Sequence, residues 1–325
     1  MKALLCTRYG TPDDLSFIDI ADPEPATGEV VVKIAAAALN FFDTLIIAGK
    51  YQYKPAMPFS PSAEFAGTVE RLGAGVTSLK VGDRVLGYSG HGAAREKIAL
   101  AADRLVKLPD RLDFDRAAGL TVTYGTSLHA LKDRAQLREG ETLAVLGASG
   151  GVGLAAVELG KIMGGRVIAC ASSAEKIAFA KKHGADGGID YASEDVKDAL
   201  RRMTGGRGAD VIYDPVGGPY AEAALRSIAW LGRFLVVGFA AGDIPKLPLN
   251  LALLKGAAVV GVFWGDFTRR EPRAFADSLR QLGDWFREGK LRPHISRTFP
   301  LREAAEALKL MAARQVKGKV VLIIE

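Results

Sequence analysis

Apolar residues in roughly the first 120 positions form short runs, either continuous or alternating with polar residues, and Gly, Pro and Asp separate them. Such runs predict β-strands joined by turns. The opening residues, MKALLCTRYG (1–10), fit a first strand better than a signal peptide because they show no small-residue cleavage pattern. Further strand candidates are EVVVKIAAAAL (29–39), EFAGTVERLG (64–73) and DRVLGY (83–88). The pattern predicts an all-β barrel or sandwich.

From about residue 125 the pattern changes, and apolar strands alternate with amphipathic helices. The strand candidates are TLAVLG (142–147), RVIACA (166–171), GGIDYA (187–192), ADVIYD (209–214), RFLVVGF (233–239) and AAVVGVFW (257–264). The helix candidates are GLAAVELGKIM (153–163), AEKIAFAKKHG (174–184), DVKDALRRM (195–203) and YAEAALRSIAW (220–230). This repeated alternation predicts an α/β domain, a parallel sheet covered by helices on both faces.

The last part of the chain returns to mixed elements. It contains FADSLRQLGDWFREG (275–289), ISRTFP (295–300), LREAAEALKLMAAR (301–314) and GKVVLIIE (318–325), which predict helix, strand, helix and strand. We expect this tail to rejoin the first domain. The predicted division is residues 1–124 for the first part of one domain, 125–262 for the α/β domain, and 263–325 for the return to the first.

Composition supports a globular protein of two domains. The 325 residues exceed what one core usually holds, and 49% of them are apolar and 25% charged. No apolar run is long enough for a membrane span. The net charge of +6 comes from bases spread along the chain, so a nucleic-acid partner is disfavoured, whereas an anionic cofactor would suit the charge. Two cysteines cannot build a disulfide framework, which predicts a cytoplasmic protein.

A glycine-rich turn, LGASGGVGLAA (146–156), joins a predicted strand to a predicted helix. Ala148, Gly150 and Gly153 have the spacing of the dinucleotide-binding fingerprint, with alanine in place of its first glycine. We expect Ala148 to allow the tight turn, Gly150 to let the backbone approach a pyrophosphate, and Gly153 to let the helix pack closely. Gly151 and Val152 would complete the turn, and the pyrophosphate would lie at the helix N-terminus.

The end of the next strand carries no carboxylate for the ribose hydroxyls. It reads CASSAEK (170–176), and so offers the Ser172 hydroxyl and the Lys176 ammonium instead. That chemistry favours a 2′-phosphate, and hence NADPH. A serine helix cap followed by an exposed lysine would explain the same residues equally well.

Several segments together resemble one enzyme family along the whole chain. They are VVVKIAAAALNFFDTLIIAGKY (30–51), GTVERLGAGVTSLKVGDRVLG (67–87), VTYGTSLHAL (122–131), the glycine turn, YDPVGG (213–218), VVGFAAG (236–242) and VVGVFWG (259–265). They resemble the zinc-free quinone oxidoreductase and zeta-crystallin group of the medium-chain dehydrogenase/reductase superfamily. The resemblance implies a GroES-like β-barrel catalytic domain, a Rossmann doubly wound domain and a homodimer formed through residues 257–264.

The same resemblance implies roles for individual residues. The 2′-phosphate of NADPH would be held by Ser172, Lys176, Tyr191 and Arg314. The nicotinamide would contact Asn40, Thr126, Val216 and the backbone of Val237, Gly238 and Phe239. Tyr51 would border the acceptor, although a merely buried ring would explain it nearly as well. Asn40 and Tyr51 are the catalytic candidates.

No metal site is expected. Cys6 and Cys170 are not placed to bind a catalytic zinc, and the four histidines, His91, His129, His183 and His294, have no metal-ligand spacing. Glu64 and Asp43 are expected to make structural hydrogen bonds. Without a Lewis acid, alcohol oxidation is disfavoured, so the acceptor should already be electron-poor.

The sequence therefore predicts NADPH-dependent, metal-independent reduction of a quinone. Reduction of an enone or 2-alkenal double bond on the same scaffold is the nearest alternative. A different class stays open as well, because members of the family have been recruited as lens crystallins and as RNA binders. The sequence decides neither the acceptor nor whether one or two electrons are transferred.

Overall fold

The computed structural model describes residues 1–108 and 112–325. The chain forms two compact units, of which unit 1 comprises Met1–Val122 and Arg273–Glu325, and unit 2 comprises Thr123–Pro272. Unit 1 therefore contains both ends of the chain. Its second joint lies at Pro272 and Arg273, ten residues after the predicted boundary at 262 and 263.

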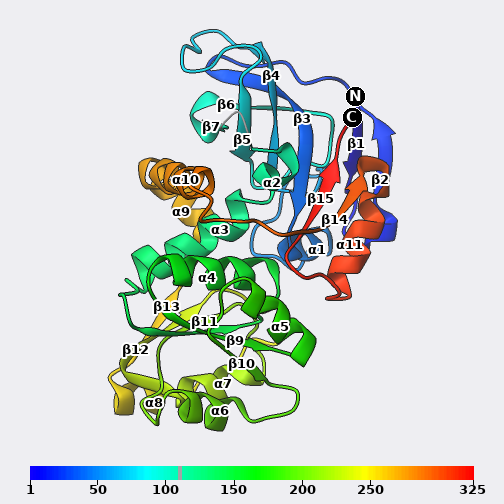
Figure 1. Cartoon of the computed structure of the whole chain (residues 1–325). Coiled ribbons are helices and arrows are strands. Elements are labelled where there is room, and N and C mark those ends of the chain that lie inside the picture. The colour runs from blue at the N-terminus through cyan, green and yellow to red at the C-terminus, as the bar shows by residue number, and fades with distance from the viewer. Residues whose placement is uncertain (109–111) are drawn as a thin grey trace. The chain divides into compact units, whose positions relative to one another are not determined.

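Unit 2 is built on a six-stranded parallel sheet of order β10-β9-β8-β11-β12-β13 (Figure 1). Its strands are β8 (Thr142–Leu146), β9 (Arg166–Ala171), β10 (Gly187–Asp190), β11 (Ala209–Asp214), β12 (Ile228–Val236) and β13 (Ala258–Gly261). The order reverses direction at β8, as in a doubly wound sheet, and places a topological switch point between β8 and β11.

Helices cover both faces of this sheet, with α4 on one face and α6, α7 and α8 on the other (Figure 1). The helices of the sheet region are α4 (Gly151–Ile162), α5 (Ala174–Lys182), α6 (Val196–Met203), α7 (Tyr220–Arg226), α8 (Leu249–Lys255) and α9 (Trp264–Arg270). They are preceded by α3 (Thr121–Leu128) and a π-helical segment (His129–Arg134). Every residue of β8 is buried, as a strand covered on both faces requires.

Two predicted elements of unit 2 were misassigned. The helix expected over 220–230 ends at Arg226, and its last residues, Ile228–Trp230, already belong to β12. The strand expected over 257–264 is shorter, since β13 ends at Gly261 and Trp264 begins α9. At the first boundary the buried apolar positions 221, 224, 225, 228 and 229 keep a helical spacing, and at the second an apolar run continues across it. The hydrophobic pattern alone therefore gave no signal for the change of element.

Unit 1 is built on a seven-stranded sheet in which strands from both ends of the chain are neighbours (Figure 1). The order is β14-β15-β3-β4-β5-β7, and β6 pairs with β3. These strands are β3 (Glu29–Leu39), β4 (Glu64–Leu72), β5 (Arg84–Tyr88), β6 (Lys97–Ala101), β7 (Leu105–Lys107), β14 (Ile295–Pro300) and β15 (Lys319–Ile323). A separate hairpin-like pair joins β1 (Lys2–Leu5) to β2 (Ser16–Asp19). Residues 273–325 thus belong to the same unit as residues 1–122.

The helices of unit 1 are α1 (Phe41–Ile47), α2 (Phe114–Ala118), α10 (Pro272–Arg287) and α11 (Ala304–Ala312), with 3-10 turns at Pro12–Asp14, Ala102–Arg104 and Leu301–Glu303. Its core combines apolar residues of β3, β4, α11 and β15. Residues 36–39 of β3 pair antiparallel with 320–323 of β15, which ties the two ends of the chain together.

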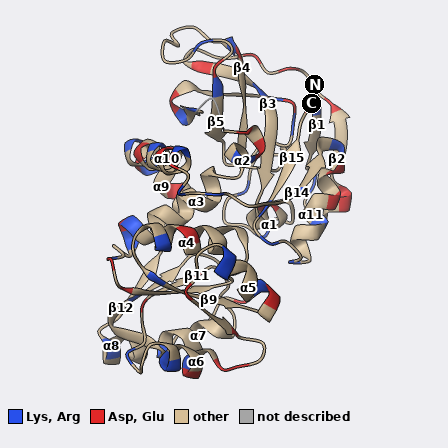
Figure 2. Cartoon of the chain, in the orientation of Figure 1, with Lys and Arg blue, Asp and Glu red and all other residues tan. Residues whose placement is uncertain are grey.

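Charged residues of both signs are interspersed over each unit in the view of Figure 2. Many of the bases are paired with carboxylates, among them Lys97 with Asp22 and Glu70, and Arg233 with Glu141. Among the described residues, no helix is both long and apolar enough to cross a membrane.

Candidate functional site

The glycine turn lies directly after β8, at the centre of the unit 2 sheet. Gly150 caps α4 in an extended conformation with φ −78°, and α4 begins at Gly151. A Cβ on Gly153 would lie 2.2 Å from the Gly147 carbonyl oxygen, so only glycine allows α4 to approach the turn this closely. A Cβ on Gly150 would meet nothing nearer than 3.4 Å. Gly153 is therefore required for packing, whereas Gly150 leaves the backbone open to a ligand.

The tight turn itself depends on Gly147 rather than on Ala148. Gly147 has φ +60°, in the left-handed region that L residues rarely adopt, and the Val216 side chain packs against it. Ala148 is fully buried, and its N–H donates to the Cys170 carbonyl at 3.1 Å. The tight turn that was assigned to Ala148 therefore occurs one residue earlier, at Gly147, because the chain reverses immediately after β8.

A second loop of the site follows β11 and is held by Asp214. One oxygen of this buried carboxylate accepts hydrogen bonds from the N–H groups of Val216 and Gly217, both at 2.8 Å. Burial raises the pKa of Asp214, and these two hydrogen bonds oppose the rise. Asp214 thus fixes the turn that places Val216 against Gly147.

The loop after β12 joins the loop after β11. The N–H groups of Val237 and Gly238 donate to the Asp214 carbonyl at 2.9 and 3.3 Å. Phe239 packs over Gly217, where a Cβ would lie 2.9 Å from its ring. All three residues are half-buried. Since the strands are parallel, the carboxyl ends of β8, β11 and β12 meet at one edge, where open α/β sheets bind ligands.

The helix α3, which carries Thr126, is attached to α4 and β11 through the next residue, Ser127. The Ser127 hydroxyl donates to the Val152 carbonyl at 2.9 Å and contacts the Tyr213 hydroxyl at 2.9 Å. These contacts attach α3 to the first turn of α4. Thr126 is itself buried.

Ser172, Lys176 and Tyr191 form a cluster at the ends of β9 and β10. The Lys176 ammonium donates to the Ser172 hydroxyl at 3.0 Å, and Tyr191 makes a side-chain hydrogen bond with Ser172. The Tyr191 ring lies 4.2 Å from the ring of Tyr220. Burial raises the pKa of Tyr191 to about 12, so its phenol is a neutral donor at physiological pH. The helix cap is the adjacent Ser173, which accepts from the Lys176 N–H, and this leaves Ser172 outside the cap.

In unit 1, Asn40 belongs to a buried polar network that the sequence did not reveal. Its Nδ2 donates to Glu64 at 2.9 Å, and its Oδ1 accepts from the Lys319 ammonium at 2.7 Å. Lys319 also donates to Glu64 at 2.6 Å. The other Glu64 oxygen accepts from the Val122 N–H at 2.6 Å. Lys319 is 4% exposed and Glu64 is fully buried.

Asp43 and Tyr51 lie beside this network. Asp43 accepts from the N–H groups of Asn40 and Ser62 at 2.7 and 3.0 Å, and it closes a capping box at the start of α1. Burial raises the pKa of Asp43 to about 7, although these hydrogen bonds and the Lys319 charge oppose the rise. Tyr51 stacks on Phe42 at 5.5 Å, and burial, with Asp43 nearby, raises its pKa. The roles expected for Glu64 and Asp43 agree with these hydrogen bonds.

Arg314 belongs to unit 1, where it follows α11 with a left-handed φ of 56° and an exposed side chain. Ser172, Lys176 and Tyr191 belong to unit 2. A common role for these four residues stays a prediction.

The histidines and cysteines make local contacts. His129 contacts Asp133 at 2.8 Å and stacks on Phe267, and His183 contacts Glu158 at 2.6 Å. Both cysteines are buried free thiols. Within residues 1–108 and 112–325, no three His, Cys, Asp or Glu side chains gather as a metal-binding group.

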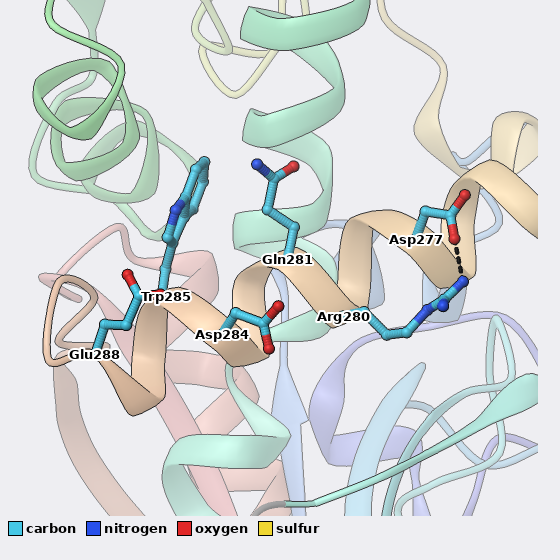
Figure 3. A pocket seen from close by; sticks show the side chains of 6 residues that line it. All are labelled: Asp277, Arg280, Gln281, Asp284, Trp285 and Glu288. Atoms are coloured by element: carbon cyan, nitrogen blue, oxygen red, sulfur yellow. Dashed lines mark hydrogen bonds and ion pairs between the residues drawn. The ribbon is translucent and has the colours of Figure 1, made fainter.

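A shallow hollow along α10 does not coincide with any predicted site residue. Figure 3 shows its lining, which is polar or charged apart from one indole, and in which Arg280 pairs with Asp277. The lining residues are Asp277, Arg280, Gln281, Asp284, Trp285 and Glu288. This alternation of charge along one helix is typical of a solvated face.

Sequence reasoning missed Gly147, Asp214 and Lys319. Gly147 directly follows an apolar strand, and Asp214 ends one, so each carried a turn signal. Lys319 begins an otherwise apolar final strand, and a base at such a position is a weak signal of a buried partner.

Two protein families match separate parts of the chain. Residues 26–110 match the family Alcohol dehydrogenase GroES-like domain, and residues 151–281 match the family Zinc-binding dehydrogenase. Among curated relatives, the quinone oxidoreductase-like protein 2 homolog of Nematostella vectensis is 38% identical, covering 99% of this chain and 88% of that protein. The quinone oxidoreductase of Pseudomonas aeruginosa is 37% identical and covers 99% of each chain.

Solved structures agree with these matches. A mycobacterial protein complexed with NADPH has a TM-score of 0.93 at 32% identity, over 99% of this chain and 100% of that one. The Escherichia coli quinone oxidoreductase complexed with NADPH has a TM-score of 0.91 at 27% identity, with the same coverage. The predicted architecture, a GroES-like domain with a Rossmann domain, is thereby confirmed. The chain is an enzyme and belongs to the quinone oxidoreductase group of the medium-chain dehydrogenase/reductase superfamily.

Proposed function

We propose that the protein is an NADPH-dependent, metal-independent quinone oxidoreductase. The observation that carries the proposal is the edge of the unit 2 sheet, where the glycine turn, the two loops after β11 and β12, and the Ser172 cluster form a continuous set. Two NADPH-bound neighbours of known structure and several relatives named quinone oxidoreductase support the same cofactor and acceptor class.

The residues present fit NADPH. The pyrophosphate would lie against Gly150, Gly151 and Val152 at the N-terminus of α4, where the first-turn N–H groups and the helix dipole favour an anion. The 2′-phosphate would be held by Ser172, Lys176 and Tyr191, and by Arg314 from unit 1. A neutral phenol, a hydroxyl and two cations suit a dianion, whereas an NAD-specific site would place a carboxylate there.

At the reacting end, NADPH supplies a hydride, and a proton from solvent or a side chain completes the reduction of a quinone to a hydroquinone. The backbone of Val237, Gly238 and Phe239, together with Val216 and Thr126, would position the ring. Asn40 would orient the nicotinamide or the acceptor. Tyr51 would donate a hydrogen bond to the developing oxyanion, because its raised pKa keeps the phenol protonated.

Metal independence is supported by the donor set around Glu64. This carboxylate already accepts hydrogen bonds from an ammonium, an amide and a backbone N–H, so its oxygens are committed to donors instead of a metal ion. The Sγ of Cys6 donates to the Arg8 carbonyl, and Cys170 is inside β9 of the other unit. A quinone tolerates the lack of a Lewis acid because it is already electron-poor.

A homodimer formed through β13 belongs to the same proposal. β13 pairs only with β12 among the described strands, and its outward residues are exposed, with Val259 at 43%. Apolar residues nearby are also exposed, including Trp230, Leu231, Leu253, Leu254 and Phe263. An unpaired apolar edge needs cover, and a second copy of the same strand supplies it symmetrically. The two free thiols support a reducing cytoplasm.

The test is a comparison of NADPH and NADH with a panel of quinones, enones and 2-alkenals, following cofactor absorbance. We expect turnover of quinones with NADPH, and at least about tenfold weaker use of NADH, which corresponds to roughly 1.4 kcal/mol. Tyr51→Phe should lower kcat without changing NADPH affinity. Equal use of NADH would contradict the cofactor assignment, and faster turnover of enones would favour double-bond reduction as the activity.

A further inference from the structure

The Lys319 ammonium is enclosed by three acceptors. It donates to the Leu39 carbonyl at 3.1 Å, to Asn40 Oδ1 at 2.7 Å and to Glu64 Oε1 at 2.6 Å. An ammonium has three N–H groups, and all three are used. The side chain is 4% exposed. Lys319 therefore has no hydrogen left to offer a ligand, and any effect it has on the reaction must pass through its partners.

Lys319, Asn40 and Glu64 form a closed ring of hydrogen bonds. The ammonium donates to both partners, and Asn40 Nδ2 donates to the same Glu64 oxygen that accepts from Lys319. This ring determines the orientation of the Asn40 carboxamide. Flipping the amide would turn Nδ2 toward the ammonium and Oδ1 toward the carboxylate, so donors would face each other, as would acceptors.

We propose that Lys319 is a positioning residue that locks the Asn40 carboxamide in one orientation, with one Nδ2 hydrogen bound to Glu64 and the other left for the nicotinamide or the acceptor. The inference rests on the proposed function, which places Asn40 at the reacting end. It gives Lys319 a role that the sequence did not suggest, because Lys319 is 279 residues from Asn40.

The charges of Lys319 and Glu64 strengthen the hydrogen bonds that hold the Asn40 carboxamide. Glu64 accepts three hydrogen bonds, from Lys319, Asn40 and the Val122 N–H, and it forms a buried ion pair with Lys319. A charged donor and a charged acceptor both strengthen the hydrogen bonds that hold the amide between them. The buried ion pair also links β15 to β4, on which Glu64 is the first residue. The stability of unit 1 and the orientation of the Asn40 carboxamide therefore depend on the same ammonium, so the test must separate the two effects.

The first variant is Lys319→Met, which keeps a linear side chain but removes the charge. We expect kcat to fall at least about tenfold, on the scale of a displaced substrate-positioning group, while NADPH affinity stays within about threefold. Lys97→Met is the matched control, because Lys97 is paired with Asp22 and Glu70 on β6 of the same sheet. It should leave kcat unchanged. Unchanged kcat in folded Lys319→Met would overturn the proposal.

The double variant Lys319→Met, Glu64→Gln separates orientation from stability. Lys319→Met alone leaves Glu64 buried without its cation, which lowers Tm, and removing the second charge should raise Tm again. Orientation is not restored, because no cation selects Oδ1. We therefore expect Tm to recover while kcat stays low. Recovery of kcat together with Tm would show that Lys319 acts only through stability and would overturn the proposal.

An activity-free measurement keeps the inference distinct from the proposed function. In ¹⁵N-edited NMR spectra, the Asn40 side-chain amide, assigned by its loss in Asn40→Asp, should give two well-separated proton signals in the wild type. In Lys319→Met both signals should shift and broaden as the carboxamide flips about χ2, and they should stay two signals because rotation about the Cγ–Nδ2 bond is slow. If the wild type showed no NADPH-dependent reduction, the proposed function would fail, yet this spectral change would still establish the lock. Unchanged Asn40 signals in Lys319→Met would refute it.

Discussion

Gly153 and Gly150 lie three residues apart at the glycine turn, yet the structure predicts different consequences for replacing each with alanine. A Cβ at Gly153 would lie 2.2 Å from the Gly147 oxygen, 2.8 Å from its carbonyl carbon and 3.0 Å from Ala148 Cα. Ordinary contact begins near 3.4 Å, so 3.4 Å less 2.2 Å leaves an overlap of about 1.2 Å. The atoms involved are backbone atoms and cannot rotate away, so α4 itself must move.

The expected cost of Gly153→Ala is at the upper end of that for overpacking, about 3 kcal/mol. For a domain of 150 to 250 residues this lowers Tm by about 6 to 12 °C, at about 2 to 4 °C for each kcal/mol. Gly150→Ala should leave Tm within about 2 °C, because φ is −78° and the nearest atom would be 3.4 Å away. It should nevertheless weaken NADPH binding at least about tenfold, since the added methyl group occupies the backbone position that faces the pyrophosphate.

The assay combines differential scanning calorimetry with titration of NADPH fluorescence on the same preparations. Gly153→Ala should lose stability, and Gly150→Ala should lose affinity with its Tm retained. A Gly150→Ala protein that bound NADPH with wild-type affinity would show that the pyrophosphate does not approach this turn. A Gly153→Ala protein with wild-type Tm would refute the packing argument.

Three further predictions concern other parts of the molecule. Lys176→Ala should raise the Kd for NADPH about tenfold and leave that for NADH nearly unchanged, as measured by fluorescence titration; equal losses would remove Lys176 from 2′-phosphate recognition. Asp43 has a pKa raised to about 7 from 3.8, so its stabilising contribution is fully present below about pH 4 and is lost as pH rises through 7, on the order of 4 kcal/mol. Urea unfolding should show this loss between about pH 4 and 7 in the wild type and not in Asp43→Asn, and parallel profiles would refute it. Val259→Lys should convert a dimer to a monomer in sedimentation velocity, because a charge at the edge of β13 opposes strand pairing, and an unchanged mass would place the interface elsewhere.

The parallel sheet of unit 2 was largely predictable because its strands are continuous apolar runs separated by glycines. Two of these strands, β9 and β11, match their predicted ranges residue for residue, as does β14 in unit 1. Boundaries failed where an apolar run crossed from one element to the next, as at Trp264, or where the helical spacing of buried residues continued into a strand, as at Ile228. Hydrophobic periodicity reports burial, and burial continues through such a boundary.

Contacts within the candidate site could be predicted only between residues that are close together in the sequence. The Ser172 and Lys176 pair is separated by one helical turn, so its contact follows from spacing. The contact of Lys319 with Glu64 spans 255 residues and depends on the pairing of β15 with β3. No periodicity encodes such a contact, because it arises from topology.

The sheet of unit 1 is complete only when β15 has been synthesised and can pair with β3. On the ribosome, residues 123–272 form a contiguous segment that can fold as soon as it emerges, whereas β3 emerges early and must wait for β15. At about 5 to 20 residues per second, the interval of roughly 280 residues lasts about 14 to 56 seconds. During that time the carboxylate of Glu64 has no ammonium, and residues 36–39 of β3 have no strand on the edge that β15 later joins. A chain cut before Lys319 would therefore contain every residue of unit 2 but lack the strand that pairs with residues 36–39 of β3 in unit 1.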